Sequence, residues 1–110
     1  MTVGELARKD GFKTAVCPEP ERQICGVYIG DLLSWVMGKA DEGDAWVTIM
    51  SNINTIAVAS LKDVACIILA ESVTFEPEII KTAEEKGVNV ILSELTAYEI
   101  AKLLSLEGIV

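Results

Sequence analysis

Four polar side chains crowd one short segment between two apolar stretches of the sequence. They are Ser51, Asn52, Asn54 and Thr55. Side chains of these types before a helix leave backbone N–H groups free, and such donors bind a phosphate or a carboxylate at a helix N-terminus. The same residue types serve as plain N-caps, which every helix needs. The sequence therefore leaves two interpretations of this segment open, an anion site and a simple helix cap.

The polar segment falls inside a strand–helix–strand pattern. Residues 46–49 and residues 66–69 are short apolar runs that suit buried strands, and a helix rich in small residues lies between them. Two buried strands joined by a helix form a βαβ unit with parallel strands and a right-handed crossover. Ligands of such sheets usually bind at the carboxyl ends of the strands. The loop over residues 50–55 is therefore the first candidate for function.

The residue types give little support for a catalytic function. The chain has no histidine, which excludes the usual general base and the Ser–His and Cys–His pairs. Neither a phosphate-binding GxxxxGK[ST] loop nor a GxGxxG dinucleotide motif occurs. Neighbouring carboxylates such as Glu84 and Glu85 are typical of the wet face of a helix. We expect no catalytic residue and no cofactor, and a small enzyme is the least favoured interpretation.

Three cysteines and no CxxC pair predict structural thiols rather than a metal site. Without histidine, a zinc site would need thiolates and carboxylates alone, which is uncommon. Buried thiols that act as small hydrophobes are the simpler interpretation. Cys66 lies within an apolar run and is predicted to be in the core, while Cys17, just before Pro18, is the one plausible reactive thiol.

Composition limits the partners and the location. The 110 residues suit one domain, residues 1–110, and the net charge of −8 argues against nucleic acid. No apolar run approaches the roughly 20 residues that span a bilayer, and the first residues lack the apolar core of a signal peptide. We expect a cytoplasmic protein that does not enter a membrane. Basic side chains in residues 1–22 make that segment the better place for an anion; they are Arg8, Lys9, Lys13 and Arg22.

Self-association is predicted from the apolar surplus. Hydrophobic residues make up 51% of the chain, a high share for a soluble domain. The helix predicted over residues 31–37 is apolar on most sides, so we expect it to be buried or to lie in an interface. The homodimer patch that we predict consists of Tyr28, Leu32, Trp35 and Val36.

Local signals predict the remaining elements. Thr2 with Glu5 and Thr96 with Glu99 each have the spacing of a capping box at the start of a helix. Asp31 is the predicted N-cap of the helix over residues 31–37, and Gly38 is its predicted C-cap. The resulting order is α-β-β-α-β-α-β-α-β-α. It predicts an α/β fold of three layers, α/β/α, with a mixed, mostly parallel sheet of about five strands.

The order of several short motifs resembles the DRTGG domain over residues 12–104. The residues that carry this resemblance are Glu21-Arg22, Cys25-Gly26, residues 28–34, residues 43–48 and Asn54. In the motif that names the family, Glu21 stands in place of aspartate, and Gly26 is the clear glycine of the pair. The resemblance implies a fold similar to the amino-terminal domain of HPr kinase.

The same resemblance implies a regulatory or accessory module rather than a catalyst. DRTGG domains occur beside nucleotide-sensing domains in some pyrophosphatases and in some phosphotransacetylases, and they tend to pair as dimers. Stand-alone copies look like bacterial proteins associated with hydrogenase or electron-transfer operons. Two interpretations follow. One is a regulatory module that dimerises and binds a small anionic ligand, such as a nucleotide, at the polar loop; the other is a ligand-free scaffold subunit that binds a metabolic enzyme or electron-transfer partner.

Overall fold

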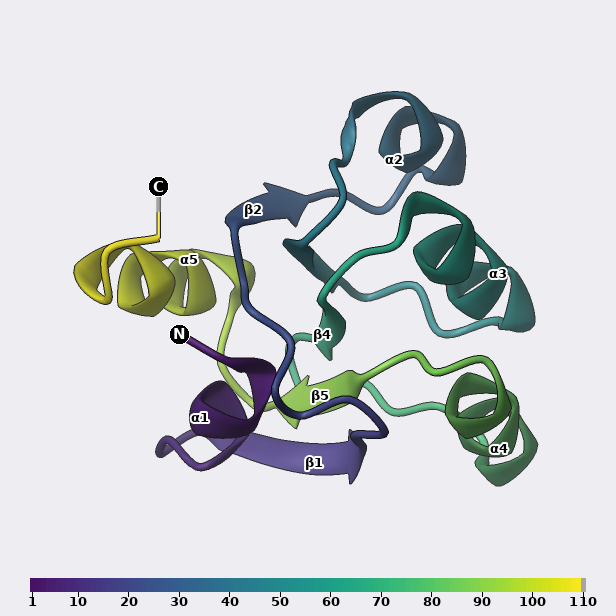
Figure 1. Ribbon diagram of the computed structural model, residues 1–110, viewed down its shortest axis with the longest axis horizontal. Helices are drawn as coiled ribbons and strands as arrows, with labels where there is room; N and C mark the ends of the chain where they lie inside the picture. Colours follow the sequence, from purple (N-terminus) through teal and green to yellow (C-terminus); the bar gives the residue numbers. More distant parts are fainter. Residues whose placement is uncertain (110) are drawn as a thin grey trace.

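The structure of the protein is a computed structural model, and it describes residues 1–109. Helices and strands follow one another in the order that the sequence predicts, with β1 and β2 as consecutive strands (Figure 1). The strands are β1 (Phe12–Val16), β2 (Gly26–Ile29), β3 (Asp44–Thr48), β4 (Cys66–Leu69) and β5 (Val90–Ser93). The helices are α1 (Val3–Ala7), α2 (Leu33–Lys39), α3 (Ile53–Lys62), α4 (Pro77–Glu85) and α5 (Ala97–Leu106).

The five strands form one mixed sheet in the order β1-β5-β4-β3-β2. Strands β2, β3, β4 and β5 run parallel, whereas β1 pairs antiparallel with β5 and places Phe12 opposite Ser93. The predicted α/β class and the mostly parallel sheet are confirmed. The carboxyl ends of the four parallel strands therefore meet at one edge of the sheet, and the amino-terminal end of β1 lies at the same edge.

Helices cover both faces of this sheet, so the predicted three layers are confirmed. Figure 1 shows α2, α3 and α4 on one side of the strands and α1 and α5 on the other. Alternate residues of each strand point to opposite faces. Trp46 of β3 belongs to the core beneath α2, α3 and α4, while its neighbour Val47 belongs to the core beneath α1 and α5. The apolar runs that the sequence marks as buried strands are buried on both sides for this reason.

Local capping signals give the starts of α1 and α5 correctly. At α1, Thr2 accepts a hydrogen bond from the Glu5 N–H, and the Glu5 carboxylate accepts one from the Thr2 N–H. Thr96 and Glu99 form the same reciprocal pair at α5. Both capping boxes are therefore confirmed. Among the described residues, no helix has both the length and the apolar character to cross a bilayer.

Helix α2 departs from its prediction at both ends. Leu32, not Asp31, is the N-cap residue, and no side chain caps this helix start. The Asp31 carboxylate instead accepts hydrogen bonds from the Thr48 hydroxyl at 2.8 Å and from the Ile49 N–H at 3.0 Å. Gly38 lies inside the helix, and Ala40 is the C-cap. Asp31 thus joins the loop after β2 to the loop after β3, because a partner distant in sequence competes successfully with the local cap.

Candidate functional site

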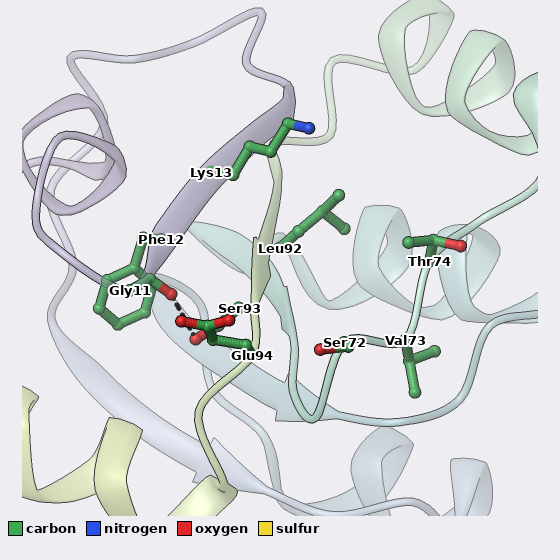
Figure 2. Close-up of a pocket in the computed structure, with 9 residues that line it drawn as sticks. All are labelled: Gly11, Phe12, Lys13, Ser72, Val73, Thr74, Leu92, Ser93 and Glu94. Atoms are coloured by element: carbon green, nitrogen blue, oxygen red, sulfur yellow. Dashed lines mark hydrogen bonds between the residues drawn. The ribbon is translucent and has the colours of Figure 1, made fainter.

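A crevice opens between the carboxyl ends of β4 and β5, where the connections from two neighbouring strands diverge. The loop after β4 leads to α4 on one face of the sheet, and the loop after β5 leads to α5 on the opposite face (Figure 1). Such a divergence is where open α/β sheets usually bind ligands. A cavity of about 390 Å³ lies at this point (Figure 2). Its lining residues are Gly11, Phe12, Lys13, Ser72, Val73, Thr74, Leu92, Ser93 and Glu94.

Pairing between β1 and β5 builds one wall of the crevice. The antiparallel register sets Lys13 opposite Leu92. Ser93 is buried, and its hydroxyl donates to the Gly11 carbonyl oxygen at 2.7 Å and accepts from the Leu95 N–H at 3.1 Å. This serine therefore fixes the start of β1 to the end of β5.

The loop after β4 forms the facing wall in a strained conformation. Glu71 and Ser72 both have left-handed backbone angles, with φ of 56° and 65°. Such angles cost free energy for residues other than glycine, and they persist where surrounding contacts enforce them, often at binding sites. Here the Glu71 N–H donates to the Leu95 carbonyl oxygen, and the Ser72 N–H donates to the Ser93 carbonyl oxygen, both at 2.9 Å. The loop is thus held against β5 by its backbone.

Polar side chains of the crevice are left free by this arrangement. Lys13, Ser72, Thr74 and Glu94 are all exposed, and Figure 2 shows Lys13 and Glu94 at separate points of the lining. The two ion pairs found within residues 1–109 involve other residues. In the same part of the chain, no hydrogen bond joins the Ser72 or Thr74 hydroxyl to a basic group. The arrangement leaves these side chains available for contact with a polar molecule.

The four predicted ligand residues gather at the start of α3. Two of them, Asn52 and Thr55, make hydrogen bonds that build the helix start and the loop before it. The Asn52 side chain caps the helix by accepting from the Asn54 N–H at 2.9 Å. Thr55 is buried and donates its hydroxyl to the Met50 carbonyl oxygen at 3.1 Å. Asn54 is exposed, and Ser51 is partly buried. Capping accounts for Asn52 and a hydrogen bond to the preceding loop accounts for Thr55, and a ligand-binding role for the loop stays a prediction.

The predicted dimer patch is divided between surface and core. Leu32 and Trp35 are 56% and 57% exposed, and Tyr28 is partly buried. Val36 is fully buried in the core beneath α2, so its side chain is not part of the protein surface. A helix that packs on a sheet must turn some side chains inward, and Val36 is the one buried residue of α2. The interface itself stays a prediction.

Further exposed apolar side chains occur at the ends of β2 and β3 and at the start of α3. Together with two of the predicted residues, they make up the set that we call the apolar patch. Its members are Ile29, Leu32, Trp35, Ile49 and Ile53, each 47% exposed or more. The Asp31 carboxylate joins the two loops that carry Leu32 and Ile49.

Arg22, the arginine of the Glu21-Arg22 motif, lies near the amino ends of the parallel strands, whereas the crevice lies at their carboxyl ends. Arg22 donates to the Asp63 carboxylate and to the Asp63 carbonyl oxygen, both at 2.6 Å. Asp63 is the C-cap of α3 and has a left-handed φ of 55°. The hydrogen bond from Arg22 lowers the pKa of Asp63 and raises that of Arg22. Arg22 therefore ties the segment before β2 to the end of α3, and of the four basic residues in residues 1–22 Lys13 alone lines the crevice.

The thiols differ from their prediction at one position. Cys66 is fully buried, and burial raises its pKa to about 12, so its place in the core is confirmed. Cys17 is partly buried, and burial also raises the pKa of its thiol. Cys25 is exposed, so it is a second candidate beside Cys17, which the sequence predicts as the one plausible reactive thiol. Cys25 precedes β2 instead of lying within it, which leaves its side chain outside the core.

The sequence does not predict the crevice, although polar residues after a buried strand are one signal of it. Ser72 and Thr74 follow the apolar run of residues 66–69, much as Ser51 and Asn52 follow the run of residues 46–49. The direction of the next connection decides which loop faces an opening, and residue types do not encode it. Within residues 1–109, no group of three metal-ligating side chains occurs.

Comparisons with known proteins agree with this architecture. Residues 23–106 match a family model described as the DRTGG domain. Among solved structures, the chain is similar to the CBS and DRTGG domains of the regulatory region of Clostridium perfringens pyrophosphatase, in complex with its activator diadenosine tetraphosphate. The TM-score is 0.68 at 17% identity, over 84% of this chain and 41% of that one. The likeness shows a shared fold. None of the curated proteins matches the chain.

Proposed function

The chain belongs to the DRTGG domain family, and we propose that it is a non-catalytic regulatory module that binds a small anionic ligand such as a nucleotide. The observation that carries this proposal is the crevice between β4 and β5. Its lining offers one free ammonium group, on Lys13, and two free hydroxyls, on Ser72 and Thr74. The solved DRTGG-containing region binds a nucleotide activator, which supports the ligand class without locating the site.

Two places for the ligand compete in this proposal. We favour the crevice, because four of its polar side chains, those of Lys13, Ser72, Thr74 and Glu94, are not used in hydrogen bonds that build the fold. The second place is the start of α3, with Ser51, Asn52, Asn54 and Thr55. There the Asp31 carboxylate lies beside the loop and binds the Ile49 N–H, and this negative charge opposes an anion.

A thermal-shift screen tests whether the module binds such a ligand at all. The probes are nucleotides, inorganic phosphate and acyl phosphates. A ligand at 100 times its dissociation constant stabilises the folded protein by about 2.7 kcal/mol, which moves the midpoint of a domain of this size by several degrees. A rise of this size with at least one probe is the expected result. No rise with any probe would contradict the ligand-binding proposal.

Matched variants then locate the ligand. Lys13→Gln removes the ammonium of the crevice, and Asn54→Ala changes an exposed residue at the start of α3. We expect the first variant to weaken the response to the best probe and the second to leave it unchanged. The reverse pattern would place the ligand at the loop after β3. Both changes lie at exposed positions, so each variant should remain folded.

We also propose that the module forms a homodimer through the apolar patch. Trp35 is the largest exposed apolar side chain of this patch, and Lys39 lies over its ring at 4.0 Å from the centroid. Sedimentation equilibrium at micromolar concentration should give the mass of a dimer. Trp35→Asp should give a monomer, because a charge in a desolvated interface is costly. A wild-type monomer would contradict this part of the proposal, and Leu61→Asp, at an exposed residue of α3, is the matched control.

A second candidate function is a scaffold that binds a protein partner and no ligand. The apolar patch favours it, since exposed apolar surface of this kind often marks an interaction site. A metabolic or electron-transfer enzyme is the partner class that we propose in that case. A chain with no ligand response, in which Trp35→Asp abolishes binding to such an enzyme, would favour the scaffold. A cytoplasmic location belongs to both proposals, because the three cysteines are free.

A further inference from the structure

We propose that the crevice selects a nucleotide with a single phosphate, a nucleoside monophosphate, over nucleotides that carry a phosphate chain. This inference rests on the proposed function and narrows its ligand. Three properties of the lining carry it, namely its cations, its carboxylate and its size.

Positive charge in the crevice is limited to one side chain. Lys13 is the one lysine or arginine among the nine lining residues. A single ammonium group can neutralise roughly one unit of phosphate charge. Each further phosphate would add negative charge that no other side chain of the lining neutralises, in a protein whose net charge is already −8. Sites for phosphate chains usually combine several cationic side chains or a glycine-rich loop, and the lining offers neither arrangement.

The carboxylate of Glu94 is a second reason to expect a ligand with a single phosphate. Glu94 lines the same cavity as Lys13 but makes no ion pair with it. An uncompensated carboxylate repels a second phosphate, and it accepts hydrogen bonds from sugar hydroxyls, as acidic residues do for ribose in dinucleotide-binding folds. A ligand with one anionic end and one hydroxyl-bearing end satisfies both side chains. A nucleoside monophosphate has this polarity, with its phosphate near Lys13 and its ribose near Glu94.

The size of the cavity agrees with a small nucleotide. Its volume is about 390 Å³, near the lower end of the roughly 300–1,000 Å³ of small-molecule sites. Leu92 and Val73 supply apolar carbon to the lining, and the hydroxyls of Ser72 and Thr74 supply further hydrogen-bonding groups (Figure 2). A dinucleotide with four phosphates would have to extend well outside this volume, where the lining residues could not contact it.

Calorimetric titration of the full chain provides the test. The probes are adenosine and guanosine 5′-monophosphate, the corresponding di- and triphosphates, diadenosine tetraphosphate, the free nucleosides and inorganic phosphate. We expect at least one monophosphate to bind about tenfold or more tightly than its triphosphate. Inorganic phosphate alone should bind more weakly than that monophosphate, because it lacks the sugar that contacts Glu94.

Charge variants link the selectivity to the two side chains. Lys13→Gln should weaken monophosphate binding about tenfold and leave nucleoside binding unchanged. Glu94→Gln should narrow the gap between monophosphate and triphosphate, because it removes the repelling charge. Lys81→Gln and Glu84→Gln make the same charge changes at exposed positions of α4 outside the lining. These two variants should leave the affinities for monophosphate and for triphosphate unaltered.

Several outcomes would overturn the inference and are distinct from failure of the proposed function. Tighter binding of triphosphates or of diadenosine tetraphosphate would keep the ligand-binding module and reject the single-phosphate choice. Selectivity that survives in both Lys13→Gln and Glu94→Gln would place the nucleotide elsewhere. Absence of binding by every nucleotide and by phosphate would reject the inference together with the proposed function.

Discussion

The loops after β3 and after β4 look alike in sequence and differ in how their hydrogen bonds are made. Each follows a buried strand, carries polar residues and leads to a helix on the same face of the sheet. In the loop after β3, side chains make the bonds, with Asn52 capping α3 and Thr55 held by Met50. In the loop after β4, the backbone N–H groups of Glu71 and Ser72 make them. The second loop therefore keeps its polar side chains available for a ligand.

Sheet topology explains why the two loops take these different roles. Strand β3 lies between β2 and β4, and the helices that follow all three strands cover one face. The loop after β3 thus has neighbours that turn the same way. Strand β5 is followed by α5 on the other face, so the loop after β4 has a neighbour that turns away. Two similar polar segments become a helix cap and a crevice wall because of the connection beside them.

The largest effect is expected where the crevice and the fold share a residue. Ser93→Ala removes the hydroxyl that bonds the Gly11 carbonyl oxygen and the Leu95 N–H. Two partly buried groups lose their partner, so the free energy of unfolding should fall by about 2 kcal/mol. Urea unfolding measures this loss, and titration should show weaker ligand binding. Ser105→Ala, at an exposed position of α5, is the control; an equal loss there would refute the role of Ser93.

A smaller effect is expected from the cap of the loop after β3. Asn52→Ala removes the acceptor for the Asn54 N–H and should lower the free energy of unfolding by about 1 kcal/mol. Ligand binding in the crevice should be unaltered, because Asn52 does not line it. The comparison between the loops fails if Asn52→Ala removes the ligand response in a protein that is still folded. That result would return the site to the start of α3.

A gain in stability is expected from the strained turn after β4. Ser72→Gly relieves the left-handed backbone at φ 65°, although glycine also makes the unfolded chain more flexible. The net gain in the free energy of unfolding should be about 0.5 kcal/mol, and ligand binding should weaken because the hydroxyl is lost. Glu71→Gly relieves the neighbouring residue, at φ 56°, and keeps that hydroxyl. A lower midpoint of thermal unfolding in both variants would contradict the inference that the backbone at Glu71 and Ser72 is strained.

The sequence predicts features that depend on near neighbours. The capping boxes at Thr2 and Thr96 involve partners three residues away, and both are present. Cys66 lies in an apolar run and is buried for that reason. The local position of Asp31 predicts a helix cap, yet its hydrogen-bond partners are Thr48 and Ile49. A contact between separate loops has no signature in the spacing of residues.

The crevice could not be predicted from the sequence for the same reason. Its lining comes from three segments, residues 11–13, residues 72–74 and residues 92–94. The first segment joins the other two because β1 runs antiparallel to β5. The order of elements does not state which edge β1 takes or in which direction it runs. Periodicity likewise marks the helix over residues 33–39 as apolar without telling that Val36 faces the core and Trp35 faces outward.

The smallest effect is expected at the amino ends of the parallel strands, where the motif arginine holds Asp63. The pair is partly exposed, with 56% of the Asp63 side chain accessible, so screening by solvent limits its stabilisation to a few tenths of a kcal/mol. The pKa of Asp63 is lowered in the folded protein. The contribution of Asp63 to the free energy of unfolding is therefore present above its pKa in the unfolded chain, about 3.9, and is lost as the pH falls through its lower pKa in the folded protein.

Asp63→Asn tests this effect, because it removes the charge and suits the left-handed backbone. The difference in the free energy of unfolding between wild type and variant should be constant near neutral pH and should shrink below about pH 4. Urea unfolding at a series of pH values measures it, and added salt should reduce it. Ligand binding should be unchanged, because neither Arg22 nor Asp63 lines the crevice. A variant that loses its ligand response would show that the family motif acts on the binding edge of the sheet as well as on the fold.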